Sequence, residues 1–314
     1  MGKRSRTRTR PRTTTTTAGE VGPRQPCPCG SGRRYKACHG APGGASAVFV
    51  ARPFEGLASE CDLVALRELV PSATAPLPLV GEHADRRVTL CTLLPMAAPA
   101  MVRDSGEVWL GLQVVHNFGD PSRDLAAVLL AALAQGEPGI VGLTEPPGEG
   151  PRLQDLVGDA PLDITVHDGF DFWVADSPDA ADVAGALDEA NGQVNPTTRL
   201  SSVPAAYWTD VTTKEHLRWV MPEPEGPLLD ALARLHVTGQ DVLVPDSRLV
   251  GMFRAHGLLT PVWDLPLGTG AEALEEPASR FASDLATTLA STEDLTSEER
   301  AARNGLAHRQ VTIR

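Results

Sequence analysis

Four residues near the N-terminus have the types and the spacing of a metal site. Cys27, Cys29, Cys38 and His39 form the pattern C-x-C-x8-C-H. Three thiolates and one imidazole fill the tetrahedral coordination of zinc and leave no position for water, which is typical of a structural rather than a catalytic site. The sequence therefore predicts a zinc ion (Zn) that stabilises a small fold.

The residues between these ligands indicate how such a fold would form. Gly30 and Gly32 let the backbone curl back toward the sulfur atoms. Three thiolates and Zn²⁺ carry a net charge of −1, and Arg33, Arg34 and Lys36 surround that charge with a basic surface. We expect these three cations to form a partner-binding face. So short a segment has almost no core, so the metal has to supply its folding energy, on the order of 10–16 kcal/mol.

The string PCPCGSGRRYKACHG at residues 26–40 resembles the SEC-C motif. This zinc knuckle occurs at the C-terminus of the bacterial SecA preprotein translocase ATPase and in many unrelated bacterial proteins. The resemblance places the zinc ligands on Cys27, Cys29, Cys38 and His39. In SecA the knuckle contacts the chaperone SecB and the ribosome, so the resemblance implies docking to a protein or to a ribosome. The chain contains no G-x-x-x-x-G-K-[ST] phosphate loop, so the SecA motor is absent.

The whole chain resembles an actinobacterial family of uncharacterised proteins with an N-terminal SEC-C knuckle (DUF5926). The stretch Val250–Pro266 and the ending GLAHRQVTIR carry this resemblance. The function of that family is unknown, so the resemblance adds no chemistry.

Charge is distributed unevenly along the chain. Residues 1–40 hold ten basic residues and one acidic residue, Glu20, for a net charge of +9; the other 18 basic and 39 acidic residues give −21. An acidic body repels nucleic acid, whereas a basic arm attracts phosphates. Contact with RNA is therefore expected only within residues 1–40.

Composition indicates a globular protein of the cytoplasm. Of 314 residues, 42% are hydrophobic and 22% charged, and no apolar run approaches the ~18 residues of a membrane span. A threonine run follows the basic N-terminus where a signal peptide needs an apolar segment. Cys61 and Cys91 lie in apolar runs and are interpreted as buried thiols rather than a disulfide.

The expected fold class is α+β, with a small N-terminal zinc knuckle before a mixed α/β body. Matching patterns around Trp109 and Trp219 suggest two duplicated β-α-β-β-α halves. The expected divisions are a disordered basic tail at 1–22, the knuckle at 23–42, halves at 47–150 and 160–270, and a helical segment at 271–314.

Apolar periodicity and capping residues predict the individual elements. The predicted strands are 47–51, 88–94, 107–115, 170–175, 206–212, 217–221, 241–244, 260–265 and, at an edge, 310–314. The predicted helices start at Ser59, Pro121, Pro178, Gly226, Ser247, Glu272 and Ser297, with capping pairs Ser59/Asp62 and Thr296/Glu299.

Other polar groups are interpreted mainly as structural. His167, Asp168 and Asp171 fit a metal or acid–base cluster, but Asp168-Gly169 favours a hairpin turn. His116 and Asn117 follow a strand, where functional side chains often lie, but Asp120 before Pro121 favours a helix cap.

Two further groups also have structural explanations. Arg254 and His256 suit the last turn of a helix, with Trp263 on the next strand. The acidic residues of the helix near 176–189 suit a solvated face; they are Asp176, Asp179, Asp182, Asp188 and Glu189.

The leading hypothesis is a zinc-binding cytosolic adaptor or docking protein whose knuckle contacts a protein or ribosomal partner. One alternative is a nucleic-acid-binding protein that uses the basic N-terminal arm. The other is an enzyme with the knuckle as an accessory, for which His116, His167 or Asp171 would have to line a cleft. No catalytic motif is present, so the hypothesis of a non-enzyme is favoured.

Overall fold

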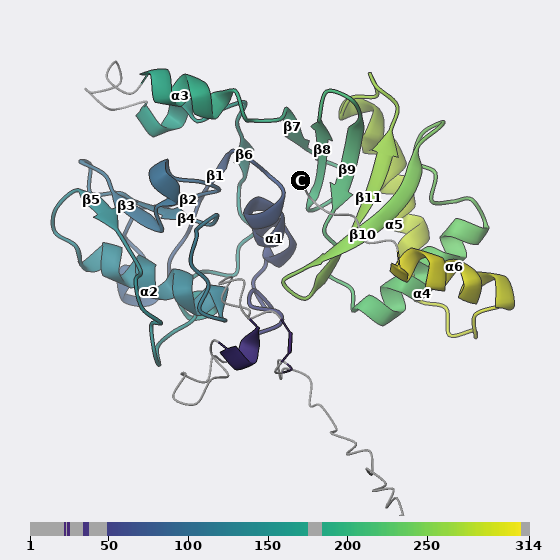
Figure 1. Ribbon diagram of the computed structural model, residues 1–314, viewed down its shortest axis with the longest axis horizontal. Coiled ribbons are helices and arrows are strands. Elements are labelled where there is room, and N and C mark those ends of the chain that lie inside the picture. Colours follow the sequence, from purple (N-terminus) through teal and green to yellow (C-terminus); the bar gives the residue numbers. More distant parts are fainter. Residues whose placement is uncertain (1–21, 23, 26–33, 38–48, 175–183, 309–314) are drawn as a thin grey trace, which may run out of the picture.

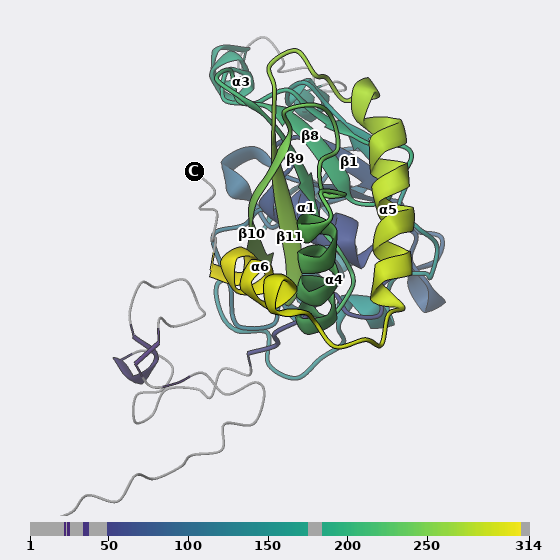
Figure 2. The same cartoon turned by 90° about the vertical axis from the view of Figure 1, so that its right-hand side faces the viewer.

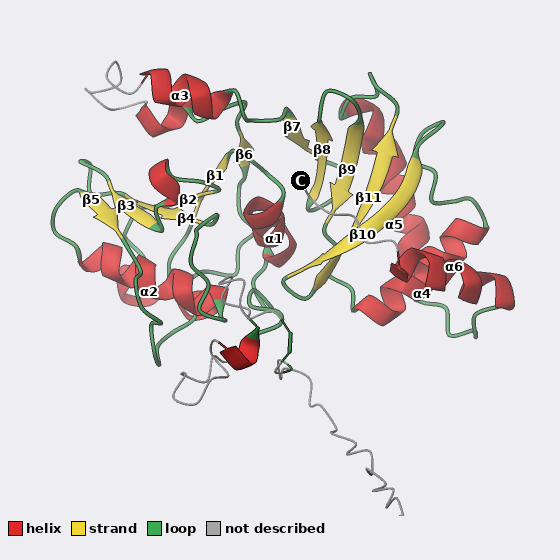
Figure 3. Cartoon of the chain, viewed as in Figure 1, coloured by secondary structure: helices red, strands yellow, loops and turns green. Residues whose placement is uncertain are grey.

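A computed structural model describes residues 22, 24–25, 34–37, 49–174 and 184–308. These residues form two β-sheets and the helices packed around them (Figures 1 and 3). The expectation of a mixed α/β body is confirmed. No helix in these ranges has the length and apolar character needed to cross a bilayer.

The first sheet has the strand order β5-β3-β4-β2-β1-β6. Only its central pair, β2 with β4, is parallel; the other neighbours are antiparallel. Helix α2 packs against β3, β4 and β5, and α1 lies between the two sheets (Figure 1). The elements are α1 (Glu60–Glu68), β1 (Ala73–Pro76), β2 (Val88–Cys91), β3 (Ala100–Val102), β4 (Val108–Gly111), α2 (Pro121–Ala134), β5 (Gly139–Val141) and β6 (Thr165–Val166).

The second sheet is antiparallel throughout, in the order β10-β11-β9-β8-β7. Helices α4, α5 and α6 cover one of its faces, as Figure 2 shows. The elements are α3 (Ala184–Asn191), β7 (Thr197–Arg199), β8 (Ala206–Asp210), β9 (Glu215–Trp219), α4 (Glu225–Val237), β10 (Arg248–Ala255), β11 (Leu258–Leu265), α5 (Glu275–Leu289) and α6 (Ser297–His308). Short 3-10 turns accompany them, including η1 (Tyr35–Ala37), η4 (Leu153–Asp155) and η5 (Asp171–Val174).

Hydrophobic side chains join the two sheets. The core cluster of α1, α2 and the first sheet also includes Tyr207, Phe253 and Val262 of the second sheet. A separate cluster fills the space between the second sheet and its helices, where Trp263 packs edge-on against Phe281 with ring centroids 5.3 Å apart. One face of the second sheet therefore packs on its own helices, and part of the other face packs against the first sheet and α1.

The largest correction concerns residues 247–257, where the sequence predicted a helix beginning at Ser247. These residues form β10, the edge strand of a hairpin with β11. Ser247 caps no helix; its hydroxyl accepts hydrogen bonds from the backbone N–H groups of Leu243 and Val244. Gly257 ends no helix either, because it lies in the hairpin turn with φ +82°. Residues 248–255 were misassigned because their apolar positions fit either periodicity.

Three predicted strands and one helix cap are also wrong. Residues 49–51 and 241–244 are irregular, and residues 171–174 form the 3-10 turn η5. Ser59 makes no side-chain cap to α1; its hydroxyl accepts from the N–H of Leu162. The strand predicted at 310–314 and the start of the helix predicted from Pro178 lie outside the described residues.

Two observations bear on the suggested duplication. The strand pairs that it would align, β2 with β4 and β8 with β9, are parallel in the first sheet and antiparallel in the second. Strand β6, which falls within residues 160–270, pairs with β1 of the first sheet.

Candidate functional site

The described residues beside the predicted zinc ligands form a small backbone clasp. The N–H of Tyr35 donates to the carbonyl oxygen of Gln25 at 2.8 Å, and the Gln25 side chain accepts from the N–H of Gly22 at 2.7 Å. Arg34 and Lys36 are exposed beside this clasp. Cys27, Cys29, Arg33, Cys38 and His39 lie outside the described residues.

The two remaining cysteines behave as the sequence predicted. Cys61 is half-buried and Cys91 is buried, and both are free thiols. Burial, with the nearby carboxylates of Glu60 and Asp62, raises the pKa of Cys61 to about 12. Burial also raises the pKa of Cys91 far above its ordinary value. Neither thiol ionises at neutral pH, so neither is an activated nucleophile.

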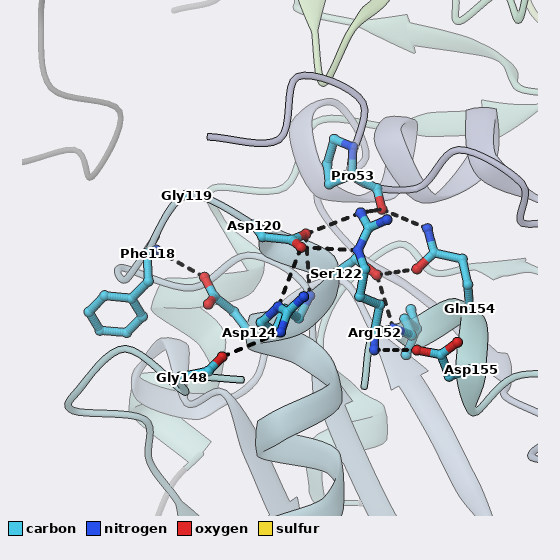
Figure 4. Close-up of polar contacts among 12 residues, drawn as sticks. Pro53, Phe118, Gly119, Asp120, Ser122, Asp124, Gly148, Arg152, Gln154 and Asp155 are labelled. Carbon is cyan, nitrogen blue, oxygen red and sulfur yellow. Dashed lines mark hydrogen bonds and ion pairs between the residues drawn. The ribbon is translucent and has the colours of Figure 1, made fainter. Parts of the chain in front are cut away.

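A polar network lies at the N-terminus of α2 (Figure 4). Asp120 caps this helix as predicted, since Oδ1 accepts from the N–H of Arg123 at 3.4 Å. The same carboxylate pairs with Arg152, whose guanidinium lies 3.0–3.2 Å from its two oxygens. Fully buried Ser122 accepts from the N–H of Leu153 at 3.0 Å. The network therefore fixes the loop that carries η4 onto α2.

This network also holds residues 49–55. We call them the entry segment because they lead from the N-terminal motif into α1. The carbonyl of Pro53 accepts from Arg152 at 2.7 Å and from the Gln154 amide at 2.8 Å. The Val50 N–H donates to the Gly119 carbonyl at 2.8 Å. Most of these donors and acceptors contact one another, although the buried Nε of Arg152 forms an ion pair with Asp120 without a hydrogen bond. The arrangement therefore positions the backbone of this region.

His116 and Asn117 lie in the loop between β4 and α2, and neither contacts another acid or base side chain within the part of the chain that the structure describes. Burial and the charge of Arg67 lower the pKa of His116, which disfavours its charged form. The amide oxygen of Asn117 accepts from the N–H of Gly119. Burial raises the pKa of Asp124, although its carboxylate accepts from the N–H of Phe118 at 2.9 Å. The residues shape the β4–α2 loop.

The segment of His167, Asp168 and Asp171 is a turn, as favoured, but it does not connect a hairpin. His167 Nε2 lies 2.8 Å from Thr74 Oγ1, and the Gly169 carbonyl accepts from the hydroxyl of Ser72 at 2.6 Å. A Cβ on Gly169 would lie 2.6 Å from Oδ1 of Asn191. Within the described residues, no group of three or more His, Cys, Asp or Glu side chains is arranged to hold a metal ion.

Arg254, His256 and Trp263 belong to the β10–β11 hairpin rather than to a helix end. Arg254 pairs with Glu225 at the start of α4. His256 Nε2 lies 2.8 Å from the carboxylate of Glu68 on α1. The Trp263 indole donates to the carbonyl of Asp241 at 2.8 Å. These residues fasten the hairpin to the rest of the body.

Of the predicted acidic helix face, Asp188 and Glu189 are exposed on α3, which agrees with a solvated surface. Asp176, Asp179 and Asp182 lie outside the described residues.

Sequence reasoning missed the charged contact between α1 and the second sheet. Asp62 accepts hydrogen bonds from the hydroxyl of Tyr207 at 2.8 Å and from the guanidinium of Arg199 at 3.1 Å. Burial and the negative charge of Asp62 raise the pKa of Tyr207. The partners lie more than 130 positions apart in the chain, so no local pattern connects them.

The described residues thus form an α+β protein. Most of the polar groups discussed above form hydrogen bonds or ion pairs with one another, and the N-terminal region holds a cysteine-rich motif. The family model described as "Family of unknown function (DUF5926)" matches residues 53–314, and the chain belongs to that family. The SEC-C motif model matches residues 24–41. No curated protein matches the chain. No solved structure matches it either.

Proposed function

We propose that this protein is a zinc-dependent docking protein, in which Cys27, Cys29, Cys38 and His39 bind Zn²⁺ and Arg33, Arg34 and Lys36 contact a protein or ribosomal partner. The observation that carries the proposal is the SEC-C match at residues 24–41. The donor set supports it, since three thiolates and one imidazole suit a closed tetrahedral zinc site.

The clasp supports the same assignment. It joins Gln25 to Tyr35, while Cys27 lies two residues beyond Gln25 and Cys38 three residues beyond Tyr35. The clasp thus brings together two stretches of chain that lie next to the first and the third predicted ligand in the sequence, as a single metal site between them requires.

The anchored entry segment is suited to a docking role. Residues 49–55 follow the motif in the chain and are held by Gly119, Arg152 and Gln154. A partner bound at the motif would therefore be attached to the body through a fixed point.

Metal analysis tests the zinc assignment. The purified full chain should contain about one zinc ion, and Cys29→Ser and Cys38→Ser should lose most of it. Cys61→Ser is the matched control, because Cys61 is a free thiol of the body, and it should retain the metal. Full zinc occupancy in Cys29→Ser would contradict the assigned ligands.

Co-sedimentation with purified ribosomes tests the docking face. The triple variant Arg33→Ala/Arg34→Ala/Lys36→Ala should bind less well than the parent chain, while retaining zinc. Arg280→Ala, which removes an exposed cation of α5, should bind as the parent does. If the triple variant and Arg280→Ala bind equally, these three cations are not the contact.

The charge of +9 on residues 1–40 favours a second candidate, direct RNA binding by the basic arm. This candidate predicts affinity for a generic single-stranded RNA that falls steeply with salt, because bound cations displace counterions. Binding that persists unchanged after deletion of residues 1–22 would exclude the arm as its source.

A further inference from the structure

Strand β10 is the outer strand of the second sheet. In the order β10-β11-β9-β8-β7, its one neighbour among the described strands is β11. In an antiparallel pair, residues that bond to the partner strand alternate with residues whose N–H and C=O groups point away from it. Every second residue of β10 therefore directs its backbone groups toward the outer edge of the sheet.

Two contacts of β11 show that Arg254 and Met252 are among these outward-facing residues. The carbonyl of Leu259, opposite Arg254, accepts a hydrogen bond from the N–H of Met221 at 3.1 Å, so this carbonyl points away from β10. Pro261, opposite Met252, has no N–H to donate. Arg254 and Met252 are two positions apart, so their N–H and C=O groups both point to the outer edge.

The outer edge of β10 is nevertheless buried at Met252. This residue is 0% exposed, backbone included, yet within the described residues its N–H and C=O groups have no hydrogen-bond partner on that side. Helix α6 packs on β10, but in the described part of the chain it forms no hydrogen bond with the strand. Buried backbone groups are nearly always paired, so the burial points to a further stretch of chain along this edge.

Residues 309–314, which lie outside the described residues, are the segment that can reach this edge. They follow α6, which ends at His308. Leu306, in the last turn of α6, is buried in the same hydrophobic cluster as Met252, and Figure 2 shows α6 beside β10. Six extended residues span about 20 Å, so they can run along most of the eight residues of β10.

The sequence RQVTIR of residues 309–314 suits an edge strand. Val311, Thr312 and Ile313 are β-branched, and such residues favour the extended conformation. In a strand, Val311 and Ile313 share one face, so both can pack on the core. Arg309 and Arg314 place a charge at each end, and charges are common on edge strands because they discourage further pairing.

We propose that residues 309–314 bind along the outer edge of β10 as an added strand of the second sheet, and that they pair with the backbone groups of Met252 and Arg254. The added strand also keeps a long edge from pairing with a second copy of the chain or with an extended segment of another protein. The contact does not involve the zinc motif and does not depend on the proposed docking function.

Amide hydrogen exchange, followed by NMR in the full chain, tests the added strand. The Met252 amide should exchange slowly, and deletion of residues 309–314 should speed its exchange at least about tenfold, because its hydrogen-bond partner is lost. The peptide RQVTIR, added to the truncated chain, should restore the protection. The Leu110 amide on β4, in the middle of the first sheet, is the control and should exchange equally in both chains.

Two proline variants of the full chain form a matched pair if the truncated chain does not fold. Neighbouring residues of a strand point their N–H groups to opposite edges. Either Val311→Pro or Thr312→Pro therefore removes a donor to β10 and should speed the exchange of Met252, while the other removes a donor that faces outward and should change it little.

Equal exchange of Met252 in the parent chain, the truncated chain and both proline variants would overturn the proposal. If its protection then rose with protein concentration, a second copy of the chain would occupy the edge instead. Fast exchange at every concentration would mean that the edge is open to a strand of another protein.

Discussion

The carboxylate of Asp62 on α1 accepts a hydrogen bond from the hydroxyl of Tyr207 on β8, 145 residues further along the chain. Both side chains are buried, and the same carboxylate pairs with Arg199 on β7. This contact joins the helix between the sheets to the second sheet by a charge rather than by apolar packing alone.

Removing this carboxylate should destabilise the protein more than removing the hydroxyl. Asp62→Ala leaves Arg199 and Tyr207 without their acceptor and should lower the free energy of unfolding by about 2–3 kcal/mol. Tyr207→Phe deletes one hydrogen bond and should cost about 1 kcal/mol. Urea denaturation measures both, with Asp188→Ala on the exposed face of α3 as the control. A cost for Asp62→Ala no larger than that control would show that the contact is not stabilising.

The two roles of Asp120 can be separated by a pair of variants. Asn is as good a helix cap as Asp, so Asp120→Asn keeps the cap of α2 and removes only the charge that faces Arg152 and Arg123. Asp120→Ala removes both and should cost about 1–2 kcal/mol more than Asp120→Asn. Thermal unfolding followed by circular dichroism compares the two. Equal losses would mean that the ion pairs with Arg152 and Arg123, not the cap, are the stabilising contacts.

A side chain at position 257, at the tip of the β10–β11 hairpin, should lower the free energy of unfolding. Gly257 has φ +82°, and an added Cβ would lie 2.8 Å from the carbonyl oxygen of Ala51. Gly268 has nearly the same φ, +83°, but open space around it. Gly268→Ala should therefore report backbone strain alone, about 1 kcal/mol, and Gly257→Ala strain plus steric overlap, about 2–3 kcal/mol. Chemical denaturation of both variants measures the difference, and its absence would mean that residues 51–52 yield freely.

Glu275 should make stability depend on pH in the acidic range. Burial disfavours its charged form, but the backbone N–H and hydroxyl groups of Ser201 and Ser202 outweigh this and lower the pKa of Glu275 from 4.5 to about 2. A carboxyl whose pKa is lower in the folded state contributes stability above its ordinary pKa, and the contribution is lost as pH falls toward the folded value.

The corresponding experiment compares unfolding between pH 5 and pH 2, a window taken from these two pKa values. Glu275→Gln should lose stability less steeply than the parent chain as pH falls. Glu276→Gln, which removes an exposed neighbour paired with Arg280, should follow the parent. Parallel curves for the parent and Glu275→Gln would contradict the prediction.

Local chemistry made part of the fold predictable. Thr296 and Glu299 form the predicted capping box at α6, with reciprocal hydrogen bonds of 2.6 and 3.2 Å. Asp120 with Pro121 correctly marks the start of α2. In both cases residues within four positions of one another determine the conformation, so the sequence pattern is sufficient.

Other features depend on residues distant in the chain and were not predictable. Residues 248–255 become a strand because β11 pairs with them, and their own apolar pattern does not distinguish strand from helix. Ser59 was expected to cap α1, but the N–H of Leu162 occupies its hydroxyl. Asp62 was expected in the same capping pair, and its partners instead come from β7 and β8.

The way in which the entry segment is held has a mechanical consequence. Arg52 reaches Glu60 at the start of α1 and the carbonyl of Pro222 before α4, while Pro53 is gripped from the α2 side. We therefore expect tension on the chain ahead of residue 49 to be shared among α1, the loop before α4 and the α2 side. A force applied to the N-terminal region would then act on several contacts together rather than on one strand.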